Sequence, residues 1–464
     1  MSDRLDGSAL KEARVLVAGL GVTGLAVVKF LEGKTRETFV TDTRGAERME
    51  AAVAAARSAG AEFVPVETLG ALPPVSLVVI SPGVPSSAGF IAGFRERGVE
   101  VAAEIELAWR FLRGTVIAIT GTNGKTTVTA LVGAIVKTSF EDIRVAGNIG
   151  DPLIGAVEGS ADDTVFVVEA SSYQLEETAR FRPRVAVVLN VAQDHVGRHP
   201  TPEAYASAKA RIAGNQGRGD RLVLNYDDPV VREMSRGARS KVLYFSAEER
   251  PARGAFVEGG GVFVGEGRRW RRALDAGDVR LPGAHNALNA AASVLAACSA
   301  GVPLEAARRA VAGFGGLEHR LEKTAEIDGV TYVNDSKATN PAAAVAAMKT
   351  FPPGRIVLII GGDDKGLDCS QLAAEAARRT RRVVLLGAAL ERVAAQMERA
   401  GCAVSRTAAM TEAVAESAAR ALAGDVVLLS PASSSFDMFK NFEERGAAFK
   451  NAVKTLSEKK KKAG

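Results

Sequence analysis

The sequence predicts an α/β protein of three domains, each built on a mainly parallel sheet wrapped by helices. The main observation is that short runs of Val, Ile and Leu alternate with Ala-rich stretches of helical character, in three successive series. The chain also has 464 residues, a length that favours two or three domains over one. Because no low-complexity linker separates the series, we expect the domains to abut around a shared cleft.

We expect these domains at residues 1–103, 104–316 and 317–464. The strands expected in the first series are RVLVAG, TFVTD, AEFVPV and LVVISPG. Those of the second are TVIAITG, TVFVVE, VAVVLNV and RLVLN, and those of the third are VTYVND, RIVLIIGG, RVVLLG and DVVLLSPA. Two apolar runs around Gly259–Gly261 predict a β-hairpin inserted into the second domain. Ligands of such sheets bind beyond the carboxyl ends of the strands, so the loops there are expected to carry the chemistry.

Composition and charge narrow the class of protein. Hydrophobic residues make up 47% and charged residues 24% of the chain, and no apolar run reaches the roughly 20 residues of a membrane-spanning helix. The N-terminus lacks the features of a secretory signal, so we expect a cytoplasmic monomer that binds no membrane. Four of the five net positive charges lie in Lys459–Lys462, so nucleic acid is not an expected partner. Cys298, Cys369 and Cys402 are too few and too scattered for a disulfide framework or a thiolate metal site.

The first strand leads into GLGVTG, a glycine fingerprint made of Gly19, Gly21 and Gly24. Asp42 follows at roughly the distance of 20 residues that the dinucleotide fingerprint requires, and Arg44 lies just beyond it. These residues favour a diphosphate bound at a helix N-terminus. An NAD-dependent dehydrogenase and a protein that binds a nucleotide-sugar diphosphate both fit this pattern.

The stretch GTNGKTT lies between a predicted strand and a predicted helix, as a phosphate-binding loop does. Ile119 stands where the usual motif has its first glycine. The backbone N–H groups of Gly121 to Thr126 can still point at phosphate oxygens. Lys125 can reach the β- and γ-phosphates, and the Thr126 hydroxyl suits Mg²⁺. The stretch therefore predicts an ATP site in the second domain.

Candidate metal ligands follow the next strands. Glu169 ends one strand, and a carboxylate at that edge can hold Mg²⁺. Asp194, His195 and His199 follow the strand after it. A lone loop histidine is usually a surface residue or a cap, but His195 shares its sheet edge with Glu169 and the phosphate loop.

Six stretches carry a resemblance to a known family: GTNGKTT, EASSYQLE, DHVGRH, GAHNALNA, HRLE and NDSKATNP. They occur in the order found in the Mur ligases, the ATP-dependent amino-acid ligases of peptidoglycan precursor synthesis, and the resemblance covers essentially the whole chain. GLGVTG with DTR, and the ending SPASSSFDMFKNFEERG, resemble the branch of the family that adds D-glutamate. The Asp-Asn-Pro-Arg motif of the diaminopimelate-adding branch is absent.

The resemblance implies a fold of three domains: Rossmann-like, phosphate-loop ATPase-like with a small β insertion, and Rossmann-like again. They would bind the UDP-substrate, ATP and the amino acid respectively, and the third would close over ATP. The implied reaction is phosphorylation of the carboxylate of UDP-N-acetylmuramoyl-L-alanine by ATP, with two Mg²⁺ ions. The amine of D-glutamate then attacks the acyl phosphate and phosphate leaves.

The resemblance also implies roles for individual residues. The catalytic residues would be Lys125, Asn148, Glu169, His195, Lys209 and Lys337. ATP would meet Gly121, Thr122, Asn123, Gly124, Lys125, Thr126, Thr127, Asn286, Asn289, Arg320 and Asp335. The UDP-substrate would meet Val22, Thr23, Asp42, Thr43, Arg44, Gly83 and Asn148, and D-glutamate would meet Thr339, Lys365, Ser435 and Phe442. The metal ligands would be Thr126, Glu169, His195 and Lys209, the last as a carbamate.

Two residues depart from the family pattern. Ala192 stands where the family commonly has Ser or Thr, and Gly197 stands where it has an acid, both beside His195. Three alternatives stay open: a relative that adds another amino acid, an NAD-dependent dehydrogenase, and a non-catalytic nucleotide switch.

Overall fold

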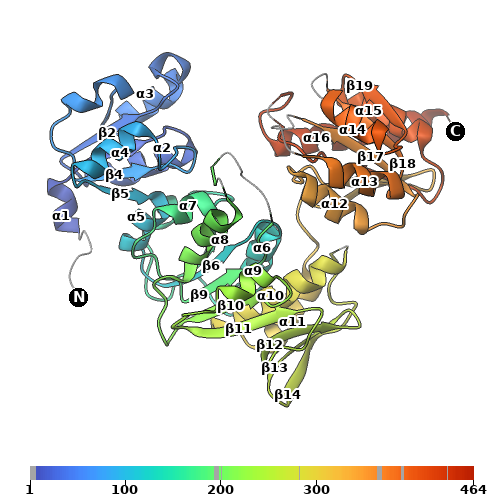
Figure 1. Cartoon of the computed structure of the whole chain (residues 1–464), viewed down its shortest axis with the longest axis horizontal. Helices are drawn as coiled ribbons and strands as arrows, with labels where there is room; N and C mark the ends of the chain where they lie inside the picture. Colours follow the sequence, from blue (N-terminus) through green and yellow to red (C-terminus); the bar gives the residue numbers. More distant parts are fainter. Residues whose placement is uncertain are drawn as a thin grey trace. The chain divides into compact units, whose positions relative to one another are not determined.

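The computed structural model describes residues 7–463 except 193–197, 200, 282, 363–367, 388–390 and 436. Three sheets follow one another along the chain, from blue to red in Figure 1. Each is mainly parallel and accompanied by helices, so the predicted α/β class is confirmed. Short 3₁₀ turns lie at η1 (Ala46–Arg48), η2 (Val66–Ala71), η3 (Leu153–Ala156) and η4 (Arg211–Ala213).

The first sheet has five parallel strands in the order β3-β2-β1-β4-β5. Its strands are β1 (Arg14–Ala18), β2 (Glu37–Thr41), β3 (Ala61–Phe63), β4 (Leu77–Ile80) and β5 (Glu100–Ala103). The helices of this region are α1 (Gly7–Glu12), α2 (Val22–Leu31), α3 (Glu50–Ser58) and α4 (Gly89–Glu96), and α5 (Glu104–Phe111) leads into the next sheet. The strand order reverses at β1, which is where ligands bind in sheets of this kind.

The second sheet has the order β14-β13-β12-β11-β10-β9-β6-β8-β7. Its parallel strands are β6 (Thr115–Thr120), β7 (Ile143–Gly147), β8 (Val165–Glu169), β9 (Val185–Val188), β10 (Arg221–Asn225) and β11 (Lys241–Ser246). The predicted hairpin is confirmed as β12 (Arg253–Glu258) and β13 (Gly261–Glu266), and β14 (Arg269–Leu274) adds a third antiparallel strand. The helices are α6 (Lys125–Val136), α7 (Ser172–Glu176), α8 (Pro202–Ala210), α9 (Pro229–Glu233), α10 (Ala284–Ser299) and α11 (Leu304–Gly313).

The third sheet has the order β15-β16-β20-β17-β18-β19, with only β15 antiparallel to its neighbour among these strands. Its strands are β15 (Glu322–Ile327), β16 (Val330–Asn334), β17 (Ile356–Gly361), β18 (Thr380–Leu386), β19 (Val404–Thr407) and β20 (Val426–Leu429). The helices are α12 (Pro341–Lys349), α13 (Ser370–Arg379), α14 (Glu391–Arg399), α15 (Met410–Arg420) and α16 (Phe442–Ala463).

The central strands form because they are apolar along their whole length. Nearly every residue of β6, β8, β9 and β17 is buried, as expected for parallel strands covered by helices on both faces. Gly121 follows β6 and Gly361 ends β17, while Ser171 and Asn190 come two residues beyond β8 and β9, and residues of these types turn the chain at the carboxyl edge of the sheet. The packing of the sheets thus directs the polar loops to one edge.

The chain divides into two compact units. The first is Met1–Val279 with Ala287–Phe314 and holds the first two sheets; the second is Arg280–Asn286 with Gly315–Gly464. Within the first unit, the Nη2 atom of Arg95 on α4 pairs with Glu177 beyond α7 at 2.6 Å. The exact boundaries at residues 103 and 316 stay a prediction. Among the described residues, no helix is long and apolar enough to cross a lipid bilayer.

Candidate active site

Close backbone contacts shape the glycine-rich loop after β1. Gly19 has a φ of +92°, and the Ser81 hydroxyl donates a hydrogen bond of 2.8 Å to its carbonyl oxygen. A Cβ atom at Gly24, in the first turn of α2, would overlap that carbonyl oxygen. The loop therefore holds the N-terminus of α2, with Val22 exposed, at the carboxyl end of β1, where an anion is favoured.

Asp42 and Arg44, at the end of β2, form a fixed pair beside this loop. The Nε and Nη2 atoms of Arg44 donate to the two Asp42 oxygens at 2.9 and 2.8 Å. The backbone N–H of Leu20 donates to Asp42 at 2.8 Å and ties the pair to the glycine-rich loop. The Arg44 hydrogen bonds lower the pKa of Asp42 to about 2, against the opposing effect of its burial. Asp42 is therefore ionised at neutral pH, and the exposed Arg44 side chain is the group that can meet an anionic ligand.

The course of β6 explains why the phosphate loop lacks its first glycine. Ile119 is fully buried in β6 and pairs with Glu169 of β8 and Val187 of β9. The strand runs through this position, so the turn begins only at Gly121, whose φ is +155°. Gly124, with a φ of +84°, precedes the first turn of α6. The strand, turn and helix predicted for this loop are all present.

Within the loop, the Lys125 amine lies over the backbone. Its Nζ atom donates to the carbonyl oxygens of Gly121 and Thr122, both at 2.9 Å. Asn289 on α10 faces the same loop, because its Oδ1 atom would lie 2.8 Å from a Cβ atom at Gly124. Lys125 and Asn289 thus meet at one place, as the predicted ATP site requires.

Asn190, just beyond β9, fixes the phosphate loop from the neighbouring strand. Its Oδ1 atom accepts hydrogen bonds from the N–H groups of Thr122 at 3.1 Å and Asn123 at 2.8 Å. Its Nδ2 atom donates to the Asn123 carbonyl oxygen at 3.0 Å. The Thr122 hydroxyl also accepts from the N–H of Ala192 at 3.0 Å. The loop is therefore held in shape before any ligand binds.

Glu169 ends β8 beside the phosphate loop and is 1% exposed. The Asn148 side chain donates to its Oε1 atom at 2.8 Å. Its Oε2 atom is buried and has no hydrogen-bond partner among the described residues. An uncompensated carboxylate oxygen is costly to bury, so this oxygen is suited to a cation that the site binds. The residues present therefore fit a Mg²⁺ ion.

Lys209 on α8 is 1% exposed and reaches the same place. Its Nζ atom donates to the Gly121 carbonyl oxygen at 2.8 Å and lies 4.3 Å from the centre of the Tyr205 ring. A buried lysine at a phosphate loop is unusual, because burial disfavours its charged form. His195 and Asp194, which were also expected here, lie outside the described residues.

His199 has a structural role in the described part of the chain. It is 6% exposed, its Nε2 atom is 3.0 Å from the Ser172 hydroxyl, and its Nδ1 atom is 3.5 Å from Glu176. Burial lowers the pKa of His199, while Glu176 opposes this effect. A neutral, bonded ring between α7 and α8 accounts for this histidine.

A second group of polar residues gathers at the carboxyl edge of the third sheet. Asp335 follows β16, and the Ser430 hydroxyl donates to its Oδ2 atom at 2.9 Å. Burial raises the pKa of Asp335 to about 7, although the bond from Ser430 opposes this. The Nζ atom of Lys337 lies 3.7 Å from the centre of the Phe442 ring at the start of α16. Ser435 is buried after β20, so the loops after β16 and β20 and the start of α16 lie together.

Known proteins resemble this chain over nearly its whole length. Family models match three parts: the MurD-like Mur ligase N-terminal domain over residues 13–103, the Mur ligase middle domain over 119–297, and the Mur ligase glutamate ligase domain over 319–433. The UDP-N-acetylmuramoylalanine–D-glutamate ligase of Pelotomaculum thermopropionicum is 41% identical, covering 96% of this chain and 98% of its own. The ligase of the same name from Acidobacterium capsulatum is 43% identical over 96% of both chains.

The chain belongs to the Mur ligase family.

Solved structures agree with the fold of this Mur ligase. The UDP-N-acetylmuramate–alanine ligase of Thermotoga maritima superimposes with a TM-score of 0.59 at 18% identity, covering 96% of this chain and 100% of its own. The MurF ligase of the same organism, solved with ADP, gives a TM-score of 0.59 at 17% identity, covering 98% and 100%. At these identities the likeness concerns the fold alone.

The sites predicted for this Mur ligase form two groups in the structure. One lies in the first unit, at the phosphate loop, Glu169, Asn148, Lys209 and Asn289; the other lies in the second unit, at Asp335, Lys337, Ser435 and Phe442. Thr43 and Gly83 are exposed beyond β2 and β4, at the same sheet edge as the glycine-rich loop. Asn286 lies one turn before Asn289 on α10. Lys365 lies outside the described residues.

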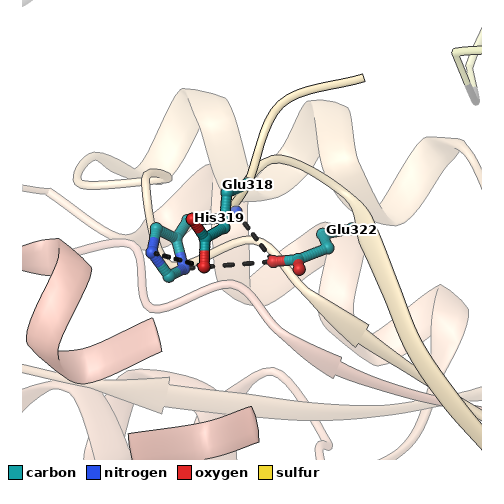
Figure 2. A group of neighbouring side chains, drawn as sticks. All are labelled: Glu318, His319 and Glu322. Atoms are coloured by element: carbon teal, nitrogen blue, oxygen red, sulfur yellow. Dashed lines mark hydrogen bonds and ion pairs between the residues drawn. The ribbon is translucent and has the colours of Figure 1, made fainter. Parts of the chain in front are cut away.

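One further cluster of metal-binding residue types lies in the second unit of this Mur ligase. Figure 2 shows Glu318, His319 and Glu322 with their ligand atoms close together. The amine of Lys450 pairs with Glu318 and lies 3.2 Å from Glu322. The Asn334 amide lies 2.9 Å from the ring nitrogen Nδ1 of His319. The Lys450 amine offsets one of the two carboxylate charges and occupies oxygens of both, so a metal ion would have to displace it.

Two residues of the site were missed by the sequence reasoning. Asn190 follows β9 and holds the phosphate loop, although its two bonded partners lie 67 and 68 positions earlier in the sequence. Arg445 on α16 is 1% exposed and bonds to three loops of the third sheet. Arg445 lies in the ending SPASSSFDMFKNFEERG, but nothing in that stretch assigns it a role, whereas the position of Asn190 just after a strand was a usable signal.

Proposed function

We propose that this Mur ligase joins D-glutamate to UDP-N-acetylmuramoyl-L-alanine, using ATP and Mg²⁺, in peptidoglycan precursor synthesis. The observation that carries the proposal is the identity of 41% and 43%, over nearly the full length, with ligases of that name. The site supports it, because a phosphate loop, a buried carboxylate and a buried lysine meet at one edge of the second sheet. A dehydrogenase would leave this second site without a role.

The reaction needs ATP because a carboxylate is a poor electrophile. Transfer of the γ-phosphoryl group to the carboxylate of the UDP-substrate breaks the bond to ADP and gives an acyl phosphate. The amine of D-glutamate then attacks the acyl carbon, loses a proton, and phosphate leaves with the electron pair of the C–O bond. Lys125 would stabilise the negative charge on the β- and γ-phosphates, in a loop whose shape Asn190 holds.

Two Mg²⁺ ions would neutralise the phosphate oxygens during this transfer. The Thr126 hydroxyl and the unpartnered Oε2 atom of Glu169 would hold one of them, and His195 the other. Lys209 would help to hold Mg²⁺ as a carbamate. A carbamylated lysine is an anion and can bind Mg²⁺, whereas a lysine cation cannot. Its burial beside Gly121 supports this. Short-chain carboxylic acids should then restore turnover to Lys209→Ala, and a complete lack of restoration would contradict the carbamate.

The other substrates would bind at the remaining sheet edges. The UDP diphosphate would lie at the N-terminus of α2, with Thr23, Thr43, Arg44 and Gly83 around it. Asn286, Asn289, Arg320 and Asp335 would meet the adenosine of ATP. Lys337, Thr339, Ser435 and Phe442, with Lys365, would receive D-glutamate. A cytoplasmic location and a monomeric state stay predictions.

The test is phosphate release from ATP and Mg²⁺ in the presence of UDP-N-acetylmuramoyl-L-alanine and one amino acid at a time. D-glutamate, L-glutamate, L-alanine and meso-diaminopimelate form the panel. Release that depends on D-glutamate supports the proposal. Release with another amino acid alone would keep the mechanism but reject the substrate, and no release with any of them would reject the function.

A further inference from the structure

Arg445, in the first turn of α16, is the largest fully buried side chain among the described residues. Its Nε atom donates to the Ser336 hydroxyl at 3.1 Å, and Nη2 donates to the Ser336 carbonyl oxygen at 2.9 Å. Its Nη1 atom donates to the carbonyl oxygens of Gly361 at 2.9 Å, Ser433 at 3.1 Å and Ser434 at 3.2 Å. These five acceptors are neutral oxygens, so the guanidinium serves here as a multiple hydrogen-bond donor.

The partners of Arg445 belong to three different loops of one sheet. Ser336 follows β16, Gly361 ends β17, and Ser433 follows β20. These strands are neighbours in the order β16-β20-β17, so Arg445 joins the carboxyl ends of three adjacent strands. The guanidinium is the side-chain group that bonds to all three of these loops at once.

The local backbone is built around this arrangement. Gly362 has a φ of +129°, and a Cβ atom there would overlap the Ser434 carbonyl oxygen and approach Arg445 to 3.0 Å. The Ser433 hydroxyl adds a bond of 2.8 Å to the Gly361 carbonyl oxygen. The Ser336 hydroxyl, while accepting from Arg445, donates to the Phe442 carbonyl oxygen at 2.8 Å. Burial lowers the pKa of Arg445 to about 10, so the side chain stays protonated at neutral pH.

The residues proposed to receive the amino acid lie on the parts that Arg445 holds. Lys337 and Thr339 follow Ser336 directly, and Ser435 follows Ser434. Phe442 begins the helix turn that carries Arg445, and the Lys337 amine lies over its ring. Asp335 is instead held by Ser430 and by its own N–H bond of 2.8 Å to the Leu429 carbonyl oxygen. The arginine therefore acts on the amino-acid side of the site more than on Asp335.

We propose that Arg445 is a positioning residue that locks the three loops of the third sheet into the arrangement that binds the incoming amino acid. The link to the amino acid rests on the function proposed above, whereas the locking of the loops does not. Lysine at this position keeps the charge but has a single nitrogen, which cannot reach the carbonyl oxygens of all three loops.

The experiment compares Arg445→Lys and Ser336→Ala with the matched control Arg381→Lys. Arg381 on β18 donates to Asp425 at 2.7 Å, at the opposite edge of the same sheet. Hydrogen exchange of the ligand-free protein is followed by mass spectrometry in segments 336–340, 361–362 and 433–435. The KM values for D-glutamate and ATP, kcat and the thermal unfolding midpoint are measured on the same preparations.

We expect Arg445→Lys to speed exchange in all three segments together and to raise the KM for D-glutamate at least about tenfold, since small misplacements of binding groups are costly. The KM for ATP should change by less than about threefold, and Ser336→Ala should give the same pattern more weakly. Arg381→Lys should change neither KM.

Exchange that rises in one segment only, or equally throughout the chain, would overturn the locking role. Loops that loosen together while both KM values rise alike, or neither rises, would overturn the link to the amino acid. If the unaltered protein released no phosphate with D-glutamate, the proposed function would fail. The exchange result would still decide whether Arg445 locks the loops.

Discussion

At the scale of single residues, the site depends on a few buried polar groups whose hydrogen bonds are incomplete or unusual. Glu169 has one oxygen bonded to Asn148 and one buried oxygen without a partner among the described residues. Lys209 is a buried amine against a backbone carbonyl. Groups of this kind cost stability in the folded protein, so their presence at a phosphate loop indicates that they serve the bound state.

Glu169→Gln tests this interpretation. The amide keeps the size of the side chain and removes the negative charge, so we expect turnover to fall by about a thousandfold, the upper range for loss of one electrostatic group. Thermal stability should stay equal or rise, because a buried carboxylate oxygen that has no hydrogen-bond partner among the described residues is removed. Glu177→Gln, which removes the partner of Arg95 in the same unit, is the control and should keep its turnover. Unchanged turnover in Glu169→Gln would contradict the metal role.

At the scale of elements, a buried carboxyl group at the start of α5 joins this helix to a loop of the second sheet. Glu104 begins α5, is fully buried, and accepts a hydrogen bond of 2.6 Å from the N–H of Ile154. Burial raises its pKa from 4.5 to about 7, despite the bonds from Ile154 and Gln174. The Glu104 carboxyl group thus joins α5 to the segment that follows Asn148.

This raised pKa predicts a pH dependence of stability. Between about pH 4.5 and 7 the unfolded chain loses the Glu104 proton while the folded chain keeps it, so the free energy of unfolding falls as the pH rises. Glu104→Gln cannot ionise, so its stability relative to the unaltered protein should increase across this window and level off above it. Urea unfolding at several pH values measures the difference. Parallel plots of unfolding free energy against pH for the two proteins would contradict the prediction. Glu96 is exposed, so Glu96→Gln controls for the loss of one carboxylate charge.

Helix α16 offers a second test at this scale. A Cβ atom at Gly446 would overlap the His319 ring. This ring is held in place, because the Asn334 amide lies 2.9 Å from its Nδ1 atom and the backbone of His319 has a φ of +63°. We expect Gly446→Ala to destabilise the protein by about 1–3 kcal/mol, the usual cost of overpacking. Gly93 on α4 has open space around its Cβ position, so Gly93→Ala should stabilise by about 0.5–1 kcal/mol. Thermal or urea unfolding checks both, and equal effects of the two would refute the packing argument.

At the scale of the whole molecule, the sequence predicted the class, the three series and the strands of the sheet centres, because those strands are apolar throughout. The strands it did not predict include β5, β7, β15 and β19, which lie at sheet edges and are partly exposed. They lack a continuous apolar run and carry a weaker signal. β11 was also missed, being half-buried over most of its length.

The residues of the candidate site also differ in how far the sequence alone predicts them. The glycine loop, the phosphate loop and Glu169 were predictable because local spacing defines them. The contacts of Asn190 and Arg445 were not predictable, because they reach partners as far as 68 and 109 positions away. Such contacts exist only after the sheet has formed.

The proposed reaction requires ATP to activate the carboxylate of the UDP-substrate as an acyl phosphate. The most direct test uses UDP-N-acetylmuramoyl-L-alanine with its carboxylate oxygens labelled with ¹⁸O, together with ATP, Mg²⁺ and D-glutamate. The phosphate released is then examined by mass spectrometry. We expect one labelled oxygen in each phosphate, because the carboxylate oxygen leaves with the phosphoryl group. Phosphate without label would mean that water attacked ATP, and the acyl-phosphate mechanism would be wrong.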